Sequence, residues 1–217
     1  MEKVVAIDGP AGAGKSTVAQ MAAKELGYTY IDTGAMYRAV AWKTLATGKP
    51  VTDELIVSIA QDIDIELHYV DGHTTVAVDG TDVTAAIRTP EVSHIVSRVA
   101  ALGPVRERLV ALQRCMATHG GVLMDGRDIA THVLPDADVK IYLTATIEER
   151  ARRRWKELRA KGNDVSLEEI EHDIAARDKA DMEREISPLI KADDAVLLDT
   201  TGMTIDEVVN RIVGMCR

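Results

Sequence analysis

Hydrophobic residues gather along the chain in short runs that are typical of buried strands. These runs cover residues 4–8, 28–32, 122–125, 139–143 and 195–199. Between most of them, apolar positions recur at helical spacing, which predicts helices over residues 16–26, 35–46, 54–62, 104–118, 147–161, 167–180 and 205–215. Alternation of strands and helices predicts an α/β fold, in which helices cover both faces of a parallel sheet.

One segment departs from this alternation. Residues 65–70 and 75–79 alternate apolar and polar side chains, and the strong hairpin-turn pairs Asp71-Gly72 and Asp79-Gly80 follow them. We therefore expect a small antiparallel sheet within an inserted lobe of residues 33–100. The parallel-sheet core would then comprise residues 1–32 and 101–217.

A glycine-rich segment follows the first predicted strand and precedes the first predicted helix. It reads Gly9-Pro10-Ala11-Gly12-Ala13-Gly14-Lys15-Ser16. This matches the phosphate-binding pattern G-x-x-x-x-G-K-[S/T] in full. The glycines allow backbone N–H groups to converge on phosphate oxygens, and the helix that follows adds its positive N-terminal end. We expect residues 9–17, including Thr17, to bind a nucleoside triphosphate, with Lys15 on its β- and γ-phosphates and Ser16 on Mg²⁺.

Two carboxylates lie at strand ends beside this segment. Asp8 closes the first apolar run and Asp125 closes the third. Either residue can hold a water molecule on Mg²⁺, and either can equally serve as a cap for the backbone. The sequence leaves these alternatives open.

Arginines also follow predicted strands. Arg38 comes shortly after the second strand, and Arg127 directly after the third. The planar guanidinium binds phosphate through two parallel hydrogen bonds, and ligands of open α/β sheets bind at the carboxyl ends of the strands. We therefore expect both arginines in the same crevice as the glycine-rich segment, where they would hold the phosphate of an acceptor.

Two later helices carry further positive charge. In the first, Arg150, Arg153, Arg154 and Lys161 can share a face. Such a face suits a mobile helical lid over a triphosphate, at about residues 148–166, although runs of charge are more often simply solvated. In the second, Arg177, Asp181 and Arg184 share a face that can hold a phosphate and a sugar hydroxyl, or can form surface ion pairs.

Composition and charge exclude several classes of protein. The formal net charge of −9 argues against a nucleic-acid backbone as the main partner. The apolar runs are far shorter than the ~20 residues of a membrane helix. The chain enters a strand directly after Met1, so we expect no signal peptide and a cytoplasmic location. The chain lacks a His-Arg-Asp catalytic-loop pattern, and an anionic phosphate acceptor needs no general base.

Together these motifs resemble bacterial cytidylate kinases, which are nucleoside monophosphate kinases with a phosphate loop (P-loop). The resemblance covers nearly the whole chain, from the first strand to about Asp199. It rests on the segments Asp8-Gly9-Pro10-Ala11-Gly12-Ala13-Gly14-Lys15-Ser16, Asp32-Thr33-Gly34-Ala35-Met36-Tyr37-Arg38, Ile87-Arg88-Thr89-Pro90-Glu91-Val92, Asp125-Gly126-Arg127-Asp128 and Glu149-Arg150-Ala151-Arg152-Arg153-Arg154.

The resemblance implies a three-layer P-loop fold with a lobe for the nucleoside monophosphate. It also implies transfer of the γ-phosphate of ATP to CMP or dCMP with Mg²⁺, by a monomer. Lys15, Arg127 and Arg184 would carry the transfer. The acceptor phosphate would be held by Thr33, Arg38, Arg127 and Arg184. The sugar would contact Arg177 and Asp181. The cytosine edge would meet Ser97, Arg106 and Asp128. The lid that closes on ATP would include Arg150 and Arg154.

Two alternatives remain at this stage. A GTPase would need an Asn-Lys-x-Asp motif, and the nearest string, Asp178-Lys179-Ala180-Asp181, lacks the Asn and lies on a predicted helix. A P-loop kinase for another small acceptor, such as UMP, AMP or shikimate, is the closer alternative. The acceptor is less firmly indicated than the chemistry, because cytosine specificity depends on only three residues.

Overall fold

The central element is the predicted parallel sheet. A computed structural model describes residues 2–70, 73–160 and 162–217, and it confirms the α/β fold. The strands are β1 (Val4–Asp8), β2 (Thr29–Asp32), β6 (Val122–Gly126), β7 (Val139–Thr144) and β8 (Val196–Asp199). They pair in the order β2-β6-β1-β7-β8, and every pairing is parallel. All five carboxyl ends therefore lie at one edge.

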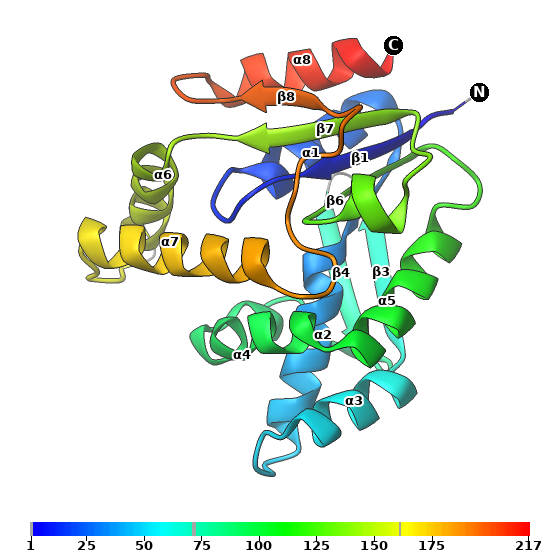
Figure 1. The fold of residues 1–217 in the computed structure, drawn as a ribbon, viewed down its shortest axis with the longest axis vertical. Coiled ribbons are helices and arrows are strands. Elements are labelled where there is room, and N and C mark those ends of the chain that lie inside the picture. The colour runs from blue at the N-terminus through cyan, green and yellow to red at the C-terminus, as the bar shows by residue number, and fades with distance from the viewer. Residues whose placement is uncertain (1, 71–72, 161) are drawn as a thin grey trace.

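Helices cover both faces of this sheet (Figure 1). On one face, α1 (Lys15–Leu26) and α8 (Ile205–Cys216) pack against apolar side chains of the strands. On the other face lie α5 (Gly103–Met116) and a π-helical turn, η2 (Ile129–Val133). Gly27 ends α1 with a φ of 71°, in the left-handed region that favours glycine, and Thr204 begins α8 with a capping box.

The inserted segment contains the predicted antiparallel sheet. Its elements are α2 (Thr33–Ala46), α3 (Asp53–Asp62), β3 (Ile65–Val70), β4 (His73–Val78), β5 (Thr81–Asp82), η1 (Ala86–Arg88) and α4 (Pro90–Ala101). Asp79 and Gly80, with φ of 50° and 76°, form the tight turn between β4 and β5. The other predicted turn, Asp71-Gly72, lies outside the described residues.

Helix α4 was not predicted from the sequence. Thr89 caps its start by accepting a hydrogen bond from the N–H of Val92, and Pro90 occupies the first turn. A threonine at the N-cap and a proline in the first turn are both helix-start signals that can be recognised in the sequence. The apolar core around α2, α3 and α4 extends into α5 through Val105 and Leu109. The division of the chain at residue 100 stays a prediction.

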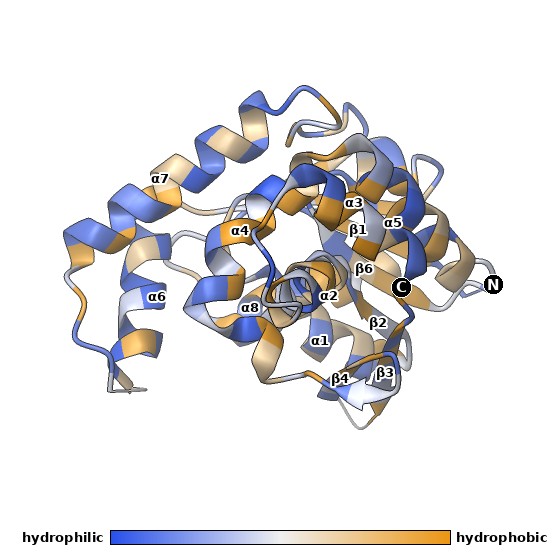
Figure 2. Ribbon diagram, turned by 90° about the horizontal axis from the view of Figure 1, so that it is seen from below, coloured by the Kyte–Doolittle hydropathy of each residue, from blue (hydrophilic) through white to orange (hydrophobic). Residues whose placement is uncertain are grey.

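Helices α6 (Ile147–Ala160) and α7 (Leu167–Glu183) form an arm beside the sheet (Figure 2). They pack on each other through Ala151, Ile170 and Ile174. The last residue of the predicted helix over 147–161, Lys161, lies outside the described part of the chain. No helix among the described residues is long and apolar enough to cross a membrane.

Candidate active site

The glycine-rich segment connects β1 to α1 in a tight loop. A side chain at Gly9 is sterically excluded, because a Cβ there would lie 1.9 Å from the carbonyl oxygen of Leu143. Gly14 stands immediately before α1 with a φ of 86°, in the left-handed region that favours glycine. The loop therefore brings backbone N–H groups to the N-terminus of α1, an arrangement that binds phosphate.

Lys15 lies buried beneath this loop. Its Nζ donates hydrogen bonds to the carbonyl oxygens of Gly9, at 2.7 Å, and of Pro10, at 2.9 Å. Burial, followed by the positive charge of Arg127, lowers the pKa of Lys15 to about 7. An anion in the loop would favour the charged ammonium, so the lysine is arranged to respond to a phosphate.

Asp125 lies beside the first turn of α1. Its Oδ2 accepts a hydrogen bond from Ser16 Oγ at 3.2 Å, and its Oδ1 accepts one from the hydroxyl of Tyr30 at 2.6 Å. Burial, and then the negative charge of Asp32, raises the pKa of Asp125 to about 6. Thr17, the other hydroxyl considered above, is exposed on α1.

The second carboxylate that the sequence left open has a different environment. Both oxygens of Asp8 accept backbone hydrogen bonds, from the N–H groups of Ile129 and Ala130, each at 2.8 Å. Asp8 therefore caps the start of η2. Of the two alternatives, the cap fits Asp8, whereas Asp125 is the carboxylate that stands next to Ser16.

Positive side chains gather opposite the loop. Arg127 Nε donates to Oδ2 of Asp181 at 2.8 Å. Arg177 is half-buried, and its Nε has no hydrogen-bond partner among the described residues. Burial, and then the charge of Arg127, lowers the pKa of Arg177 to about 10. These guanidinium groups lie close enough to disfavour each other's charge, which an anion placed between them would relieve.

Arg38 extends this positive region along α2. Its Nη1 donates to the carbonyl oxygen of Ile87 at 3.2 Å and to Ser93 Oγ at 2.9 Å. Burial, and then the charge of Arg88, lowers the pKa of Arg38. A small cavity here is lined by Arg38, Arg88, Ser93, Arg154 and Glu157. Arg88 belongs to one of the motifs that carry the family resemblance, but it was not predicted as a site residue. The sequence signal that could have identified Arg88 is its place directly before Thr89 and Pro90, the residues that start α4.

Thr33 is buried at the start of α2, and its Oγ1 donates to the carbonyl oxygen of Asp125 at 2.8 Å. This bond places the N-terminus of α2 next to the end of β6. The segment that carries Thr33 and Arg38 is therefore held against the segment that carries Arg127, as the common sheet edge predicts.

A buried ionic group lies at the far end of this region. Asp128 accepts hydrogen bonds from Nη2 of Arg106 and, at 3.3 Å, from Nη2 of Arg184. The Arg106 guanidinium also stacks over the ring of Tyr37, at 5.5 Å from its centroid. Ser97 is half-buried on α4, one turn before Ala100, whose carbonyl oxygen accepts from Arg106. The structure thus brings together Arg106 and Asp128, two of the three residues expected at the cytosine edge.

The side chains of the arginines of α6 reach different partners. Arg150 is buried and turns toward Ala11 of the loop, as described below. Arg153 reaches the carbonyl oxygens of Ala13, at 3.5 Å, and of Thr200, at 2.8 Å. Arg154 pairs with Glu157 and lines the cavity of Arg38. Arg153, which was not a selected site residue, is therefore the α6 arginine beside the start of α1.

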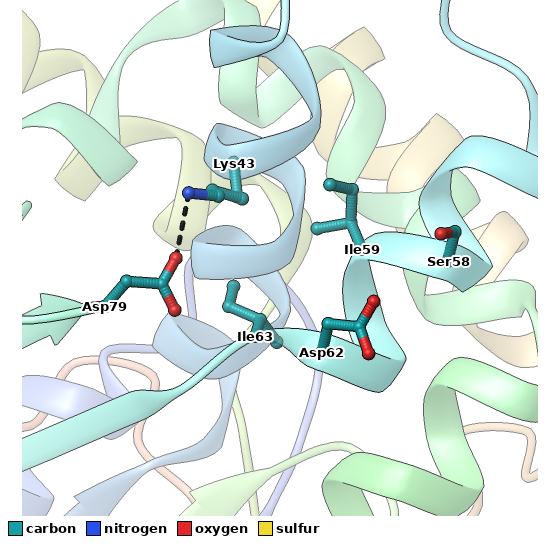
Figure 3. Close-up of a pocket in the computed structure, with 6 residues that line it drawn as sticks. All are labelled: Lys43, Ser58, Ile59, Asp62, Ile63 and Asp79. Carbon is teal, nitrogen blue, oxygen red and sulfur yellow. Dashed lines mark ion pairs between the residues drawn. The ribbon is translucent and has the colours of Figure 1, made fainter.

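A second small cavity lies between α2, α3 and the turn after β4 (Figure 3). Its lining includes Lys43, whose Nζ pairs with Asp79 at 2.8 Å, and a further carboxylate, Asp62. Two carboxylates face one ammonium group there, which does not suit a phosphate ligand. None of the predicted site residues lines this cavity.

The phosphate loop at the carboxyl edge of a parallel sheet defines a P-loop nucleotide-binding fold. Two solved structures share the fold. An uncharacterized protein from Eubacterium ventriosum ATCC 27560 has a TM-score of 0.54 at 13% identity, covering 99% of this chain and 97% of that one. A gluconokinase from Sinorhizobium meliloti 1021 has a TM-score of 0.50 at 14% identity, covering 99% and 91%. At these identities the similarity concerns the fold alone.

The family follows from sequence comparison. The cytidylate kinase family model matches residues 5–217. A cytidylate kinase from Desulfitobacterium hafniense (strain Y51) is 57% identical over 212 residues, which are 97% of this chain and 91% of that protein. Another, from Symbiobacterium thermophilum, is 51% identical over 218 residues, covering 100% and 96%. The chain belongs to the cytidylate kinase family, which confirms the resemblance drawn from its motifs.

Proposed function

We propose that this protein transfers the γ-phosphate of ATP to CMP or dCMP, giving ADP and CDP or dCDP. Membership of the cytidylate kinase family supports this activity. The observation that carries it is the position of Arg127. Arg127 directly follows Gly126 of β6, which pairs with Asp8 just before the phosphate loop, and its Nε donates to Asp181 of α7 at 2.8 Å, so it links the loop side of the site to α7. Transfer between two phosphates requires such an arrangement.

The donor would bind in the loop of residues 9–17. Loop N–H groups and Lys15 would hold the β- and γ-phosphates, and Arg153 lies close enough to assist. The hydroxyl of Ser16 and the carboxylate of Asp125 are hard oxygen ligands within hydrogen-bonding distance of each other, which fits a Mg²⁺ site. Ser16 and Asp125 would hold Mg²⁺ there, and the ion would supply positive charge that offsets the negative charge of the phosphates. Asp125 would be kept ready for this by the hydrogen bond from Tyr30.

The acceptor would bind across α2, η2 and α7. Its phosphate would meet Thr33, Arg38, Arg127 and Arg184, and its sugar Arg177 and Asp181. Ser97, Arg106 and Asp128 would face the base. Cytosine presents an exocyclic amino group where uracil presents a carbonyl oxygen, so the Asp128 carboxylate would favour cytosine.

The chemistry needs no general base in this arrangement. The attacking oxygen of the acceptor phosphate is already anionic, and the barrier lies in bringing two anions into line. Lys15, Arg127 and Arg184 would screen this charge during transfer. A monomeric, cytoplasmic enzyme that acts without a nucleic-acid partner remains our expectation, supported for the last point by the net charge of −9.

A coupled assay of ADP release tests the proposal. Wild-type protein would be assayed with ATP and Mg²⁺ against CMP, dCMP, UMP, AMP and shikimate, with a control lacking any acceptor. We expect kcat/KM for CMP or dCMP to exceed that for the others by tenfold or more, about 1.4 kcal/mol. Faster turnover of UMP, AMP or shikimate would show that the acceptor has been assigned wrongly.

A further inference from the structure

Side chains from α6 and α7 hold both backbone polar groups of Ala11, in the middle of the phosphate loop. The Ala11 N–H donates to Oδ1 of Asp178 at 3.0 Å, and its carbonyl oxygen accepts from Nη1 of Arg150 at 2.8 Å. The same Nη1 donates to Oδ2 of Asp178 at 2.6 Å. These three residues, Ala11, Arg150 and Asp178, are called the Ala11 clasp below.

The clasp is buried. Arg150 is 4% exposed and Asp178 is 6% exposed. Nε of the same guanidinium donates to the carbonyl oxygen of Ala145 at 3.0 Å. Because desolvation offsets most of the attraction within a buried ion pair, such a pair is a weak source of stability. Its geometry, which ties three chain segments to one point, indicates a positional role.

Helix α7 connects the clasp to the acceptor region. Asp178 directly follows Arg177, whose Nε lacks a partner among the described residues, and Asp181 lies one turn further along. Because a helical turn is rigid, holding Asp178 against the loop also fixes the positions of Arg177 and Asp181 relative to the loop. Loop and helix are in direct contact through the bond between the Ala11 N–H and Asp178, and a Cβ added to Gly12 would lie 3.4 Å from Cδ1 of Ile174.

We propose that Arg150 and Asp178 are positioning residues, and that the Ala11 clasp sets the relative placement of the phosphate loop and the acceptor-binding face of α7. The proposal rests on the proposed phosphoryl transfer. Arg150 acts through the loop backbone, in place of the contact with ATP expected from the family resemblance. The first turn of α6, which contains Arg150, then stays fixed against the loop, and any movement of the lid involves only the residues that follow this turn.

Loss of the clasp should affect kcat, because the rate of transfer depends on the alignment of the donor and acceptor phosphates. A displacement of about 1 Å between reacting groups can cost up to about 100-fold in rate. Loss of the clasp leaves Lys15 and the acceptor arginines in place as ligands. It therefore lowers kcat, while each nucleotide still binds through its own contacts. A purely structural role would lower the melting temperature and leave kcat per folded molecule unchanged.

Asp178→Asn is the first test, because the amide keeps the shape and can still accept from the Ala11 N–H. Its NH₂ group faces Nη1 of Arg150, so the pair is broken. We expect kcat with CMP to fall at least tenfold, and the dissociation constants of ADP and CMP, from titration calorimetry, to change less than threefold. Arg150→Lys keeps the charge but loses the planar fork, and we expect a smaller fall in kcat.

Ile170→Ala is the matched control. Ile170 is buried between α6 and α7 and is not part of the clasp, so this variant loosens the arm without touching Ala11. We expect a lower melting temperature with kcat per folded molecule within twofold of wild type. If Asp178→Asn fails to fold, Arg150→Lys decides the question against the same control.

Two results would refute the positioning role of the Ala11 clasp. One is an equal loss of kcat in the clasp variants and in Ile170→Ala, which would mark a general stability effect. The other is a tenfold weaker binding of ADP with kcat unchanged, which would make Arg150 an ATP ligand. Failure of wild-type protein to phosphorylate CMP or dCMP would instead refute the proposed function, so the two failures are distinguishable.

Discussion

The buried carboxyl of Asp8 makes the stability of this protein depend on pH in an unusual direction. Asp8 is 2% exposed, and both of its oxygens accept N–H groups at the start of η2. Burial outweighs these two hydrogen bonds and raises the pKa of Asp8 from 3.8 to about 6. The residue thus caps the turn that follows Asp128, at the cost of holding a carboxylate out of water.

The change in the free energy of unfolding with pH depends on how many protons the folded and the unfolded states bind. Between pH 3.8 and about 6 the folded protein binds the Asp8 proton and the unfolded chain releases it. The native state therefore binds more protons, and the free energy of unfolding falls as the pH rises through this window. The two pKa values differ by an amount equivalent to about 3 kcal/mol in total. About 1 kcal/mol of this is lost between pH 5 and pH 7.5.

Asp8→Asn removes the titrating group and keeps its shape. The free energy of unfolding would be measured by urea denaturation at pH 5 and pH 7.5 for both proteins. We expect the wild type to lose about 1 kcal/mol more than the variant over this interval. The raised pKa of Asp125 has burial and Asp32 as its largest causes, and Asp8 is not among them, so this titration is present in both proteins. Parallel pH profiles would show that Asp8 is already ionised at pH 5 in the folded protein, which would refute the reasoning.

Three further predictions concern the site. Lys15→Ala removes the buried ammonium group under the loop, and we expect kcat in the coupled assay to fall by about 10²–10³-fold; near-normal turnover would exclude Lys15 from the mechanism. Asp128→Asn should reduce the ratio of kcat/KM for CMP over UMP by about tenfold, more than it slows CMP turnover, and an unchanged ratio would place base selection elsewhere. Arg153→Met should raise the KM for ATP several-fold at saturating CMP, because Arg153 reaches Ala13; an equal rise in the KM for CMP would contradict a donor-side role.

Much of the fold was predictable because its signals are local. Runs of apolar residues identify the five strands of the parallel sheet, and Asp79-Gly80 identifies one hairpin turn, since both signals depend on the conformations of neighbouring residues. Helix α4 was missed although Thr89 and Pro90 mark its start. Its apolar positions, Val92, Val96 and Val99, lie at helical spacing and could have been recognised.

The carboxylates show where sequence reasoning stops. Asp8 and Asp125 both end apolar strands, and nothing local separates a cap from a ligand. The difference arises because the N–H groups of η2 meet Asp8, whereas Ser16 and Tyr30 meet Asp125. These partners are distant in sequence, and only the pairing of β1 and β6 brings them together.

The phosphate loop is what the sequence by itself determined about this protein, together with the sheet that carries it. A loop of this kind depends on which residues tolerate its backbone angles and on the strand and helix that flank it, and all of this is local. Tertiary structure alone decided which way the arginines of α6 point. Arg150 meets Ala11 across 139 positions of the chain, while Arg154 turns to the cavity of Arg38. Four positions apart on one helix, they serve different segments, because the packing of α6 against the loop and α7 determines which polar groups each can reach.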